Sequence, residues 1–251
     1  MGSESRPEAS ELRARAAEVL SRIERAALRA GRDPAAVRLV AVSKTHPAAL
    51  VRDAAEAAGV RDFGENRVQE AEAKIEGLRT DAPGLRWHLI GHLQPNKARR
   101  AARLFDLIHS VDTAALVERL ERLCADDGRE RLEVLVQVDL AGEASKSGAT
   151  VGELPALFEV LGRCARVRCR GLMIVPPFFE DVEKVRPFFR RLRETRDVWR
   201  ARGAFGGEAG ELSMGMSHDY EAAVEEGATL VRVGTALFGA RGSGGAAGSL
   251  T

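Results

Sequence analysis

Eight short segments of strand character recur along the chain, and each is followed by a segment of helical character. Most of them are apolar runs rich in Val, Leu and Ile, and turn or helix-start residues close them, as is typical of buried strands. They cover residues 38–45, 62–66, 86–91, 107–112, 133–140, 170–175, 211–216 and 229–234. Strands that alternate with helices form a parallel sheet. Eight such units in 251 residues predict an α/β fold with a single closed (β/α)₈ barrel, with an open doubly wound sheet as the alternative.

A long amphipathic helix is predicted ahead of the first strand, from Ala9 to Ala30. Its apolar positions follow helical spacing: Leu12, Ala16, Val19, Leu20, Ile23 and Ala27. We therefore expect three segments. A flexible tail covers 1–7, the barrel with its extra N-terminal helix covers 8–240, and a flexible Gly- and Ser-rich tail covers 241–251.

Composition excludes several classes of function. The formal net charge of +1 gives no reason to expect nucleic acid or an anionic membrane as partner. No apolar run approaches the roughly 18 residues that span a bilayer, and the N-terminus lacks the apolar region of a signal peptide. The three cysteines form no CxxC pair, which predicts reduced, core-filling thiols. We expect a cytoplasmic protein and, since no apolar surface stripe demands a partner, a monomer.

The first apolar run ends in a lysine. Val40 and Val42 alternate toward Lys44, and Pro47 opens the following helical pattern. A lysine that faces a core is costly unless it is paired or chemically used. Burial also lowers the pKa of such an amine and makes it a usable nucleophile. Lys44 is therefore the first candidate for the functional site.

Two glycine-containing turns follow the last two strands. Gly215 and Ser217 lie where the seventh strand leads into a helix, and Gly234-Thr235 does the same after the eighth. Helix N-termini present free N–H groups to a phosphate, and the loops after strands seven and eight are the frequent phosphate site of barrels. Each turn alone has a simpler interpretation: Ser217 is only an N-cap, or Gly234 is only a turn glycine. Both together favour a phosphate site.

Four further polar residues have roles that the sequence leaves open. Arg232 lies inside an apolar run and needs a partner, which is either a carboxylate such as Asp139 or Glu65 or an atom of a ligand. Asn66 ends the second strand and is either part of the site or a helix cap. His88 and His92 are four residues apart, but they span a strand and its loop, so we predict no metal site.

An amine at one strand end and a phosphate site at two others predict a ligand with an aldehyde and a phosphate. Pyridoxal 5'-phosphate (PLP) fits this description, because a lysine holds it as a Schiff base. A phosphorylated sugar in a Schiff-base aldolase fits the same reasoning. The residues taken by themselves do not separate the two.

Seven motifs in order resemble the pyridoxal phosphate homeostasis protein family, the single-domain relatives of the alanine racemase N-terminal barrel. They are Ala41–Thr45, Phe63–Glu70, Trp87–Lys97, Ser145–Gly148, Gly171–Met173, Leu212–Asp219 and Val231–Thr235. The resemblance extends from about residue 10 to 241 and disfavours the aldolase. Asp139 stands where the family pattern suggests Asn, and the loop before Ser145 also departs from the pattern.

The resemblance implies a role for each candidate residue. It implies that Lys44 binds PLP as a covalent imine, and that Ser217, Gly234 and Thr235 hold its phosphate. It implies that Arg232 faces the pyridine nitrogen and that Asn66 lies near the ring. These six are the expected cofactor-binding residues, and we expect no catalytic residue and no metal.

An arginine beside the pyridine nitrogen disfavours its protonation, so the ring is a weaker electron sink. Racemisation also needs a second base, which the racemase relatives take, by resemblance, from a C-terminal β-domain, and we expect this chain to stop where the barrel ends. We predict a non-enzymatic protein of intracellular PLP homeostasis that buffers PLP, with PLP-dependent apo-enzymes as candidate recipients. The alternative is a PLP-dependent amino-acid racemase that acts as a lone barrel, with Asp139 or Ser110 as its base.

Overall fold

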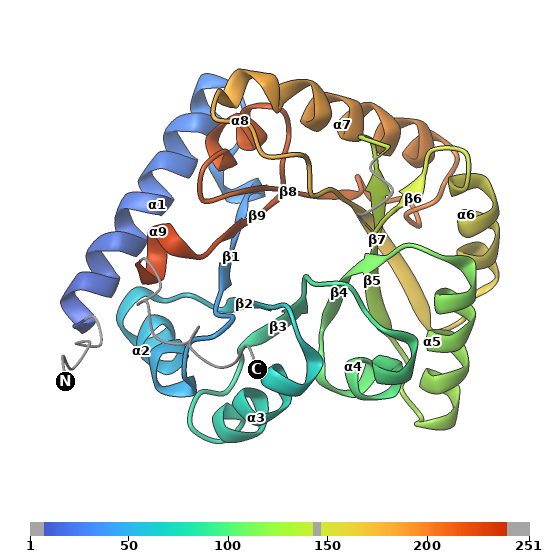
Figure 1. Cartoon of the computed structure of the whole chain (residues 1–251), viewed down its shortest axis with the longest axis horizontal. Helices are drawn as coiled ribbons and strands as arrows, with labels where there is room; N and C mark the ends of the chain where they lie inside the picture. The colour runs from blue at the N-terminus through green and yellow to red at the C-terminus, as the bar shows by residue number, and fades with distance from the viewer. Residues whose placement is uncertain (1–7, 143–146, 240–251) are drawn as a thin grey trace, which may run out of the picture.

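The computed structural model describes residues 8–142 and 147–239, and its centre is a closed ring of parallel strands (Figure 1). In ring order the strands follow the sequence, and pairing of β4 with β5 and of β1 with β9 closes the ring. The eight barrel strands are β1 (Arg38–Val42), β2 (Asp62–Glu65), β3 (Arg86–Leu89), β4 (Leu107–Val111), β5 (Leu132–Asp139), β7 (Val167–Met173), β8 (Glu211–Met216) and β9 (Leu230–Val233). The predicted (β/α)₈ barrel is therefore confirmed, and the open sheet is wrong because β4 and β5 pair.

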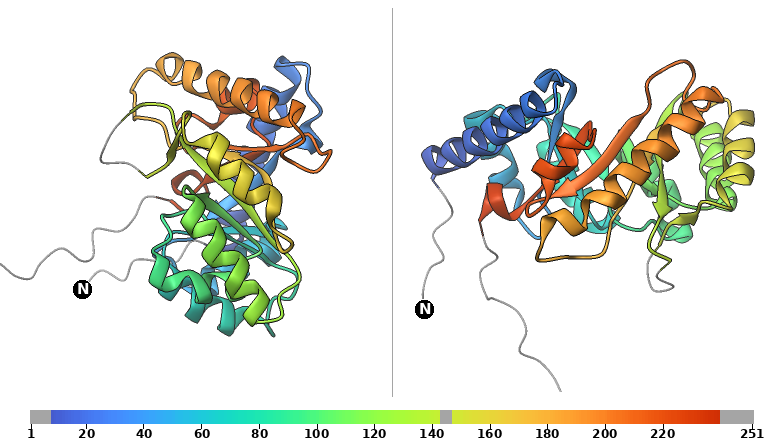
Figure 2. Two further views of the ribbon diagram at one scale, coloured as in Figure 1. Left: turned by 90° about the vertical axis from the view of Figure 1, so that its right-hand side faces the viewer. Right: turned by 90° about the horizontal axis from the view of Figure 1, so that it is seen from above.

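Helices form the outer layer around the strands, as Figures 1 and 2 show from three directions. They are α1 (Ala9–Arg29), α2 (Ala48–Ala58), α3 (Val68–Leu78), α4 (Ala98–Leu104), α5 (Ala114–Asp126), α6 (Leu154–Arg163), α7 (Arg186–Ala201), α8 (Tyr220–Glu225) and α9 (Thr235–Phe238). Short 3₁₀ turns cover Pro34–Ala36, Pro95–Lys97 and Val182–Lys184. None of the helices in the described part of the chain is long and apolar enough to cross a membrane.

Helix α1 covers the outside of the barrel beside α2, α8 and α9 (Figure 1). Its buried stripe contains Leu12, Val19 and Ile23, as the spacing predicted. The prediction was wrong for Leu20, which is 45% exposed because it lies off this stripe. The stripe joins the apolar layer between strands and helices, so the extra helix belongs to the barrel domain.

The apolar interior has two parts. The larger lies between the strands and the ring of helices, and all three cysteines are buried in it as free thiols. The smaller lies inside the ring of strands: Val40, Leu107, Leu135, Met173 and Leu230. Buried polar side chains share this inner space with the apolar ones, and they position the site described below.

Several element boundaries differ from those expected. The first strand ends at Val42, because Ser43 to His46 form a turn closed by the His46 N–H and the Ser43 carbonyl oxygen. A two-residue strand, β6 (Ala149–Thr150), adds to the edge of β5. Between β7 and β8 the helical part of the chain divides into the 3₁₀ turn Val182–Lys184 and α7. Both predicted tails, together with residue 240 and the Ser145 and Lys146 positions of the Ser145–Gly148 motif, lie outside the described residues.

Candidate functional site at the carboxyl ends of four neighbouring strands

Lys44 lies in the tight turn that follows β1. Thr45, the next residue, has a φ of 67°, a left-handed conformation that is costly for a β-branched side chain. Lys44 is half-buried rather than buried, and its amine has no hydrogen-bond or ion-pair partner among the described residues. Because β1 ends at Val42, strand alternation does not fix the direction of the Lys44 side chain. The turn places Lys44 at the carboxyl end of β1, with an amine to which none of the described residues is bound.

A buried charged cluster behind the barrel wall holds this turn. The Lys74 amine, from α3, donates to the Ser43 carbonyl oxygen and to Glu65 Oε1, each at 2.7 Å. The Ser43 hydroxyl donates to the same Glu65 oxygen at 2.7 Å, and the Thr45 N–H donates to Glu70. Burial raises the pKa of Glu65, and the Lys74 ammonium opposes that shift. The backbone on both sides of Lys44 is thus fixed by side chains outside the barrel.

Asn66 follows β2, the neighbour of β1 in the ring. It is not the N-cap of α3, since Arg67 occupies that position. The Asn66 backbone packs directly against Gly91, where a Cβ atom would lie 2.3 Å from the Asn66 carbonyl oxygen. Only glycine permits this approach. Asn66 therefore lies half-buried at the mouth, one strand away from Lys44.

The loops after β8 and β9 meet at Ser217 and Gly234. The Ser217 hydroxyl accepts a hydrogen bond from the Gly234 N–H at 3.2 Å, so Ser217 joins the two loops and is not the N-cap of α8, which is Asp219. A Cβ atom on Gly234 would lie 3.3 Å from the Val42 carbonyl oxygen, which places this loop against the end of β1. Thr235 is exposed and begins α9, where the first N–H groups have no partner within the helix.

Arg232 points into the barrel and is 4% exposed. Its guanidinium donates to the Ser213 hydroxyl oxygen at 2.6 Å and to the Ile174 carbonyl oxygen at 2.8 Å. No carboxylate of the described residues lies within ion-pair distance of it. Burial lowers the pKa of Arg232 to about 10, and Asp219 opposes the shift through a longer-range coulombic interaction. The guanidinium still carries the charge at neutral pH, and some of its five N–H donors are unused.

The two carboxylates considered as partners for Arg232 have other roles. Glu65 faces outward to Lys74. Asp139 accepts hydrogen bonds from the N–H groups of Ala141 and Gly142, which fold the loop after β5. The direct carboxylate pairing is therefore wrong for both residues. Of the two kinds of partner expected for Arg232, a carboxylate or a ligand atom, the geometry leaves the ligand atom open.

The six predicted residues come from strands that are neighbours in the order β2, β1, β9, β8. They lie at the carboxyl ends of these strands, except Arg232, which points inward from β9 just below. Sequence reasoning missed the residues that position them, above all Lys74, Ser213 and His109. A buried serine and histidine within apolar strand runs were the available signal for the last two. The described residues contain no group of three potential metal ligands.

Comparison with known proteins defines the class to which this fold and site belong. The protein-family model described as the alanine racemase N-terminal domain matches residues 17–242 of this chain. Alanine racemase from Corynebacterium glutamicum is 18% identical, with a TM-score of 0.61 over 94% of this chain and 64% of the racemase, a likeness of fold. The chain is a barrel of the alanine racemase N-terminal class.

Closer relatives narrow the assignment. A pyridoxal phosphate homeostasis protein from Pseudomonas aeruginosa is 49% identical over 91% of this chain and 95% of its own length. The counterpart in Escherichia coli K12 is 41% identical over 90% of this chain and 94% of its own. PipY of Synechococcus elongatus, whose structure has PLP bound, is 44% identical, with a TM-score of 0.75 over 88% of this chain and all of PipY. The chain belongs to the pyridoxal phosphate homeostasis protein family.

Proposed function

We propose that this chain binds PLP at the mouth of its barrel and takes part in PLP homeostasis. The observation that carries the proposal is the buried Arg232 guanidinium, which has unused donors and contacts no carboxylate of the described residues. A buried cation of this kind needs an acceptor, and the pyridine nitrogen of PLP is one. The PLP-bound relative supports the choice of ligand.

Each end of the ligand has a suitable group in this chain. Lys44 supplies an amine for the aldehyde carbon, on a turn that Lys74 and Glu65 hold in place. Ser217 and Thr235 supply hydroxyl groups for the phosphate, and Thr235 adds a backbone N–H at the start of α9. Gly234 keeps the two loops together at this site, because its N–H donates to Ser217. Asn66 approaches from the side of β2, where it borders the ring.

We infer that the chain holds PLP without efficient turnover. When bound, PLP supplies an electron-accepting ring, but Arg232 is a donor that gives up no proton to the ring nitrogen, which weakens that sink. The single tyrosine of the chain is buried. Arg22 of α1 lies over the Tyr220 ring, 5.5 Å from its centroid, on the outer side of the barrel. Tyr220 is therefore not a base at the mouth.

The two residues expected to act as the base of a lone-barrel racemase, Ser110 and Asp139, are bound to groups of the protein itself. The Ser110 hydroxyl donates to the Gly91 carbonyl oxygen at 2.7 Å, and Asp139 is bound to loop N–H groups. Both groups have structural partners in place of a substrate. We propose buffering of PLP, with PLP-dependent apo-enzymes as recipients, as the function that the site favours.

Lys44→Ala tests this proposal. Purified protein mixed with PLP is expected to develop a near-visible absorption band and, after borohydride reduction, a permanent mass increase on the Lys44 peptide. Lys44→Ala should lose both, and Lys184→Ala, which changes an exposed lysine of the 3₁₀ turn before α7, should keep both. The same adduct in Lys44→Ala would overturn the assignment of Lys44. Turnover of amino acids at roughly 1 s⁻¹ or faster, an ordinary enzymatic rate, would overturn the non-enzymatic role.

A further inference from the structure

A continuous chain of buried polar side chains crosses the inside of the barrel, and it ends at Arg232. His88 Nε2 lies 2.8 Å from Asp62 Oδ1, and His88 Nδ1 lies 2.8 Å from His109 Nε2. His109 Nδ1 lies 2.9 Å from the Ser213 hydroxyl oxygen, which in turn accepts from Arg232. We call these five residues the polar chain. Both histidines and Ser213 are 0% exposed.

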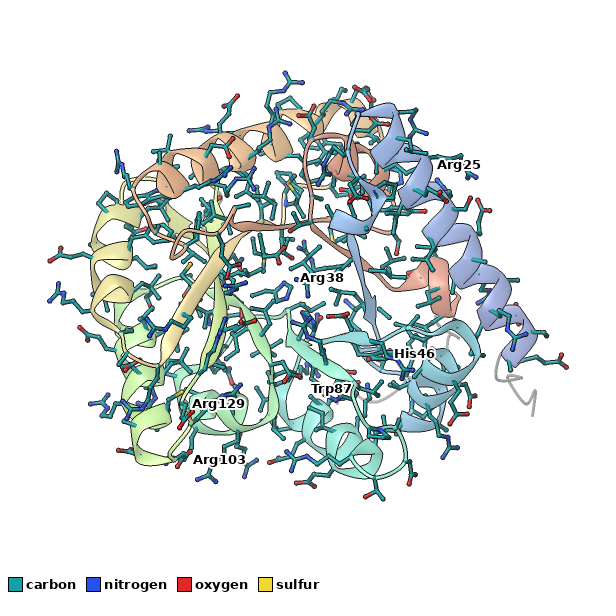
Figure 3. The ribbon with its side chains drawn as sticks, turned by 180° about the vertical axis from the view of Figure 1, so that it is seen from behind. Arg25, Arg38, His46, Trp87, Arg103 and Arg129 are labelled. Atoms are coloured by element: carbon teal, nitrogen blue, oxygen red, sulfur yellow. The ribbon has the colours of Figure 1, made fainter. Side chains whose placement is uncertain are left out.

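The two ends of the polar chain carry opposite charges. Asp62 is the first residue of β2, at the amino ends of the strands, where Arg38 and Arg86 each lie 3.7 Å from its carboxylate. Figure 3 shows Arg38 near the middle of the ring of strands. Burial alone would raise the pKa of Asp62. The hydrogen bond from His88 opposes burial, and the pKa of Asp62 lies below its usual value. Asp62 is thus a carboxylate and Arg232 a guanidinium, so the polar chain joins an anion to a cation.

These charges fix every proton in between. A carboxylate only accepts, so His88 Nε2 must carry the proton that it shares with Asp62, and neutral His88 then accepts at Nδ1. His109 must therefore donate from Nε2 and accept at Nδ1. That acceptor takes the Ser213 hydroxyl proton, which leaves the Ser213 oxygen free to accept from Arg232. Burial lowers the pKa of both histidines, well below the ordinary value for His109, so both are neutral at pH 7.

We infer that Ser213, His109 and His88 are positioning residues that fix the orientation of the Arg232 guanidinium through a hydrogen-bond chain of one polarity. Two N–H groups of the guanidinium, on Nη1 and Nη2, donate to Ser213 and Ile174. The remaining donors are left for a ligand at the mouth. Reversing the polarity would make the Ser213 oxygen accept from both His109 and Arg232, and would leave the Ser213 hydroxyl proton without an acceptor among the described residues. The polar chain therefore orients Arg232 and conducts no proton to or from it.

The proton positions are tested on the ligand-free protein. Long-range ¹H–¹⁵N spectra distinguish the two neutral tautomers and the charged ring, and single variants at His88 and His109 assign their signals. We expect both residues to be neutral and protonated at Nε2 at pH 7. A proton on Nδ1 of either ring, or a charged ring, would overturn the inference without any reference to PLP.

The positioning role rests on the proposed function and is tested by two variants of His109. Asparagine places its carbonyl oxygen near the position of Nδ1, so His109→Asn retains an acceptor for Ser213. Glutamine places its amide near Nε2, so His109→Gln retains the donor to His88 but loses that acceptor. We expect His109→Asn to bind PLP within about threefold of the unchanged protein, and His109→Gln and Ser213→Ala to bind roughly tenfold more weakly, the effect of a hydrogen bond lost at a charged group.

Circular dichroism and thermal unfolding establish that each variant is folded, and His92→Asn, on an exposed histidine, is the control. Equal affinities for the two His109 variants would overturn the positioning role. If the unchanged protein bound no PLP, the proposed function would fail, whereas the tautomer measurement would still decide the polarity of the polar chain.

Discussion

Lys74 reaches the backbone of the residue that precedes Lys44. Its amine lies 2.7 Å from the Ser43 carbonyl oxygen and 2.7 Å from Glu65 Oε1, and its side chain is only 8% exposed. The second Glu65 oxygen has no partner among the described residues. A buried ion pair adds little net stability, but loss of one partner leaves the other charge uncompensated. The cluster therefore links the stability of the fold to the position of the proposed anchor lysine.

Lys74→Met should destabilise the protein by about 3–5 kcal/mol, because Glu65 would then be buried without its cation. The variant should also form the Lys44 adduct more slowly, since the turn loses one of its anchors. Denaturant unfolding and the time course of the near-visible band measure the two effects.

Lys184→Met is the matched control, because Lys184 is exposed, and we expect a change within about 0.5 kcal/mol. A double variant, Glu65→Gln with Lys74→Met, should recover part of the stability by removing the buried charge. If Lys74→Met were as stable as the control, the cluster would have no anchoring role.

Two glycines distinguish close packing from simple helix propensity. A Cβ atom at Gly91 would lie 2.3 Å from the Asn66 carbonyl oxygen, whereas one at Gly77, inside α3, would meet nothing within 4 Å. Gly91→Ala should therefore cost about 1–3 kcal/mol or more and displace Asn66. Gly77→Ala should stabilise by about 0.5–1 kcal/mol. Similar unfolding free energies for the two variants would contradict the packing of Gly91 on Asn66.

Topology explains why the sequence alone brings the candidate site residues together at one end of the barrel. Lys44, Ser217 and Gly234 each follow an apolar run, and in a parallel barrel the ends of all strands meet at one mouth. Once eight strands had been counted, no information about register was needed to bring these three together. The choice between PLP and a phosphorylated sugar as the ligand came from the family motifs.

The supporting residues could not be predicted in the same way. His109 and Ser213 are 104 positions apart, and their contact depends on the tilt and register of strands across the barrel. Lys74 belongs to a polar stretch of α3 that is typical of a solvated face, and the packing of α3 against β2 and the turn after β1 buries it. Leu20 shows the converse, since helical spacing alone did not separate the edge of the stripe from its centre.

The buried histidines predict how stability depends on pH. Burial lowers the pKa of His88 and His109 in the folded protein below the ordinary value of 6.5. Below about pH 6.5 the unfolded chain therefore binds protons that the folded chain does not, and stability falls as pH falls. Each histidine contributes a slope of up to about 1.4 kcal/mol per pH unit until its folded pKa is reached.

Urea unfolding between pH 7.5 and 5 measures this slope. His109→Asn should reduce it by about one histidine's share, whereas His92→Asn, which removes an exposed histidine, should leave it unchanged. A stability that is flat across this range would show that the two buried rings take up protons in the folded state.

Ser217 and Thr235 are predicted to hold the phosphate of PLP from two loops that already touch. The Ser217 hydroxyl accepts from the Gly234 N–H at 3.2 Å, and Thr235 is exposed at the start of α9, so neither side chain contributes to the core. Ser217→Ala and Thr235→Ala should each weaken PLP retention roughly tenfold, the effect of one hydrogen bond to a charged group. The melting temperature of the ligand-free protein should change by no more than a few degrees. Dialysis of PLP-loaded protein measures retention, and pyridoxal without phosphate should bind the variants and the unchanged protein alike.

Thr195→Ala on α7, whose hydroxyl donates to the Arg191 carbonyl oxygen, is the control for loss of a surface hydroxyl. Retention in Ser217→Ala and Thr235→Ala equal to that of this control would place the phosphate elsewhere.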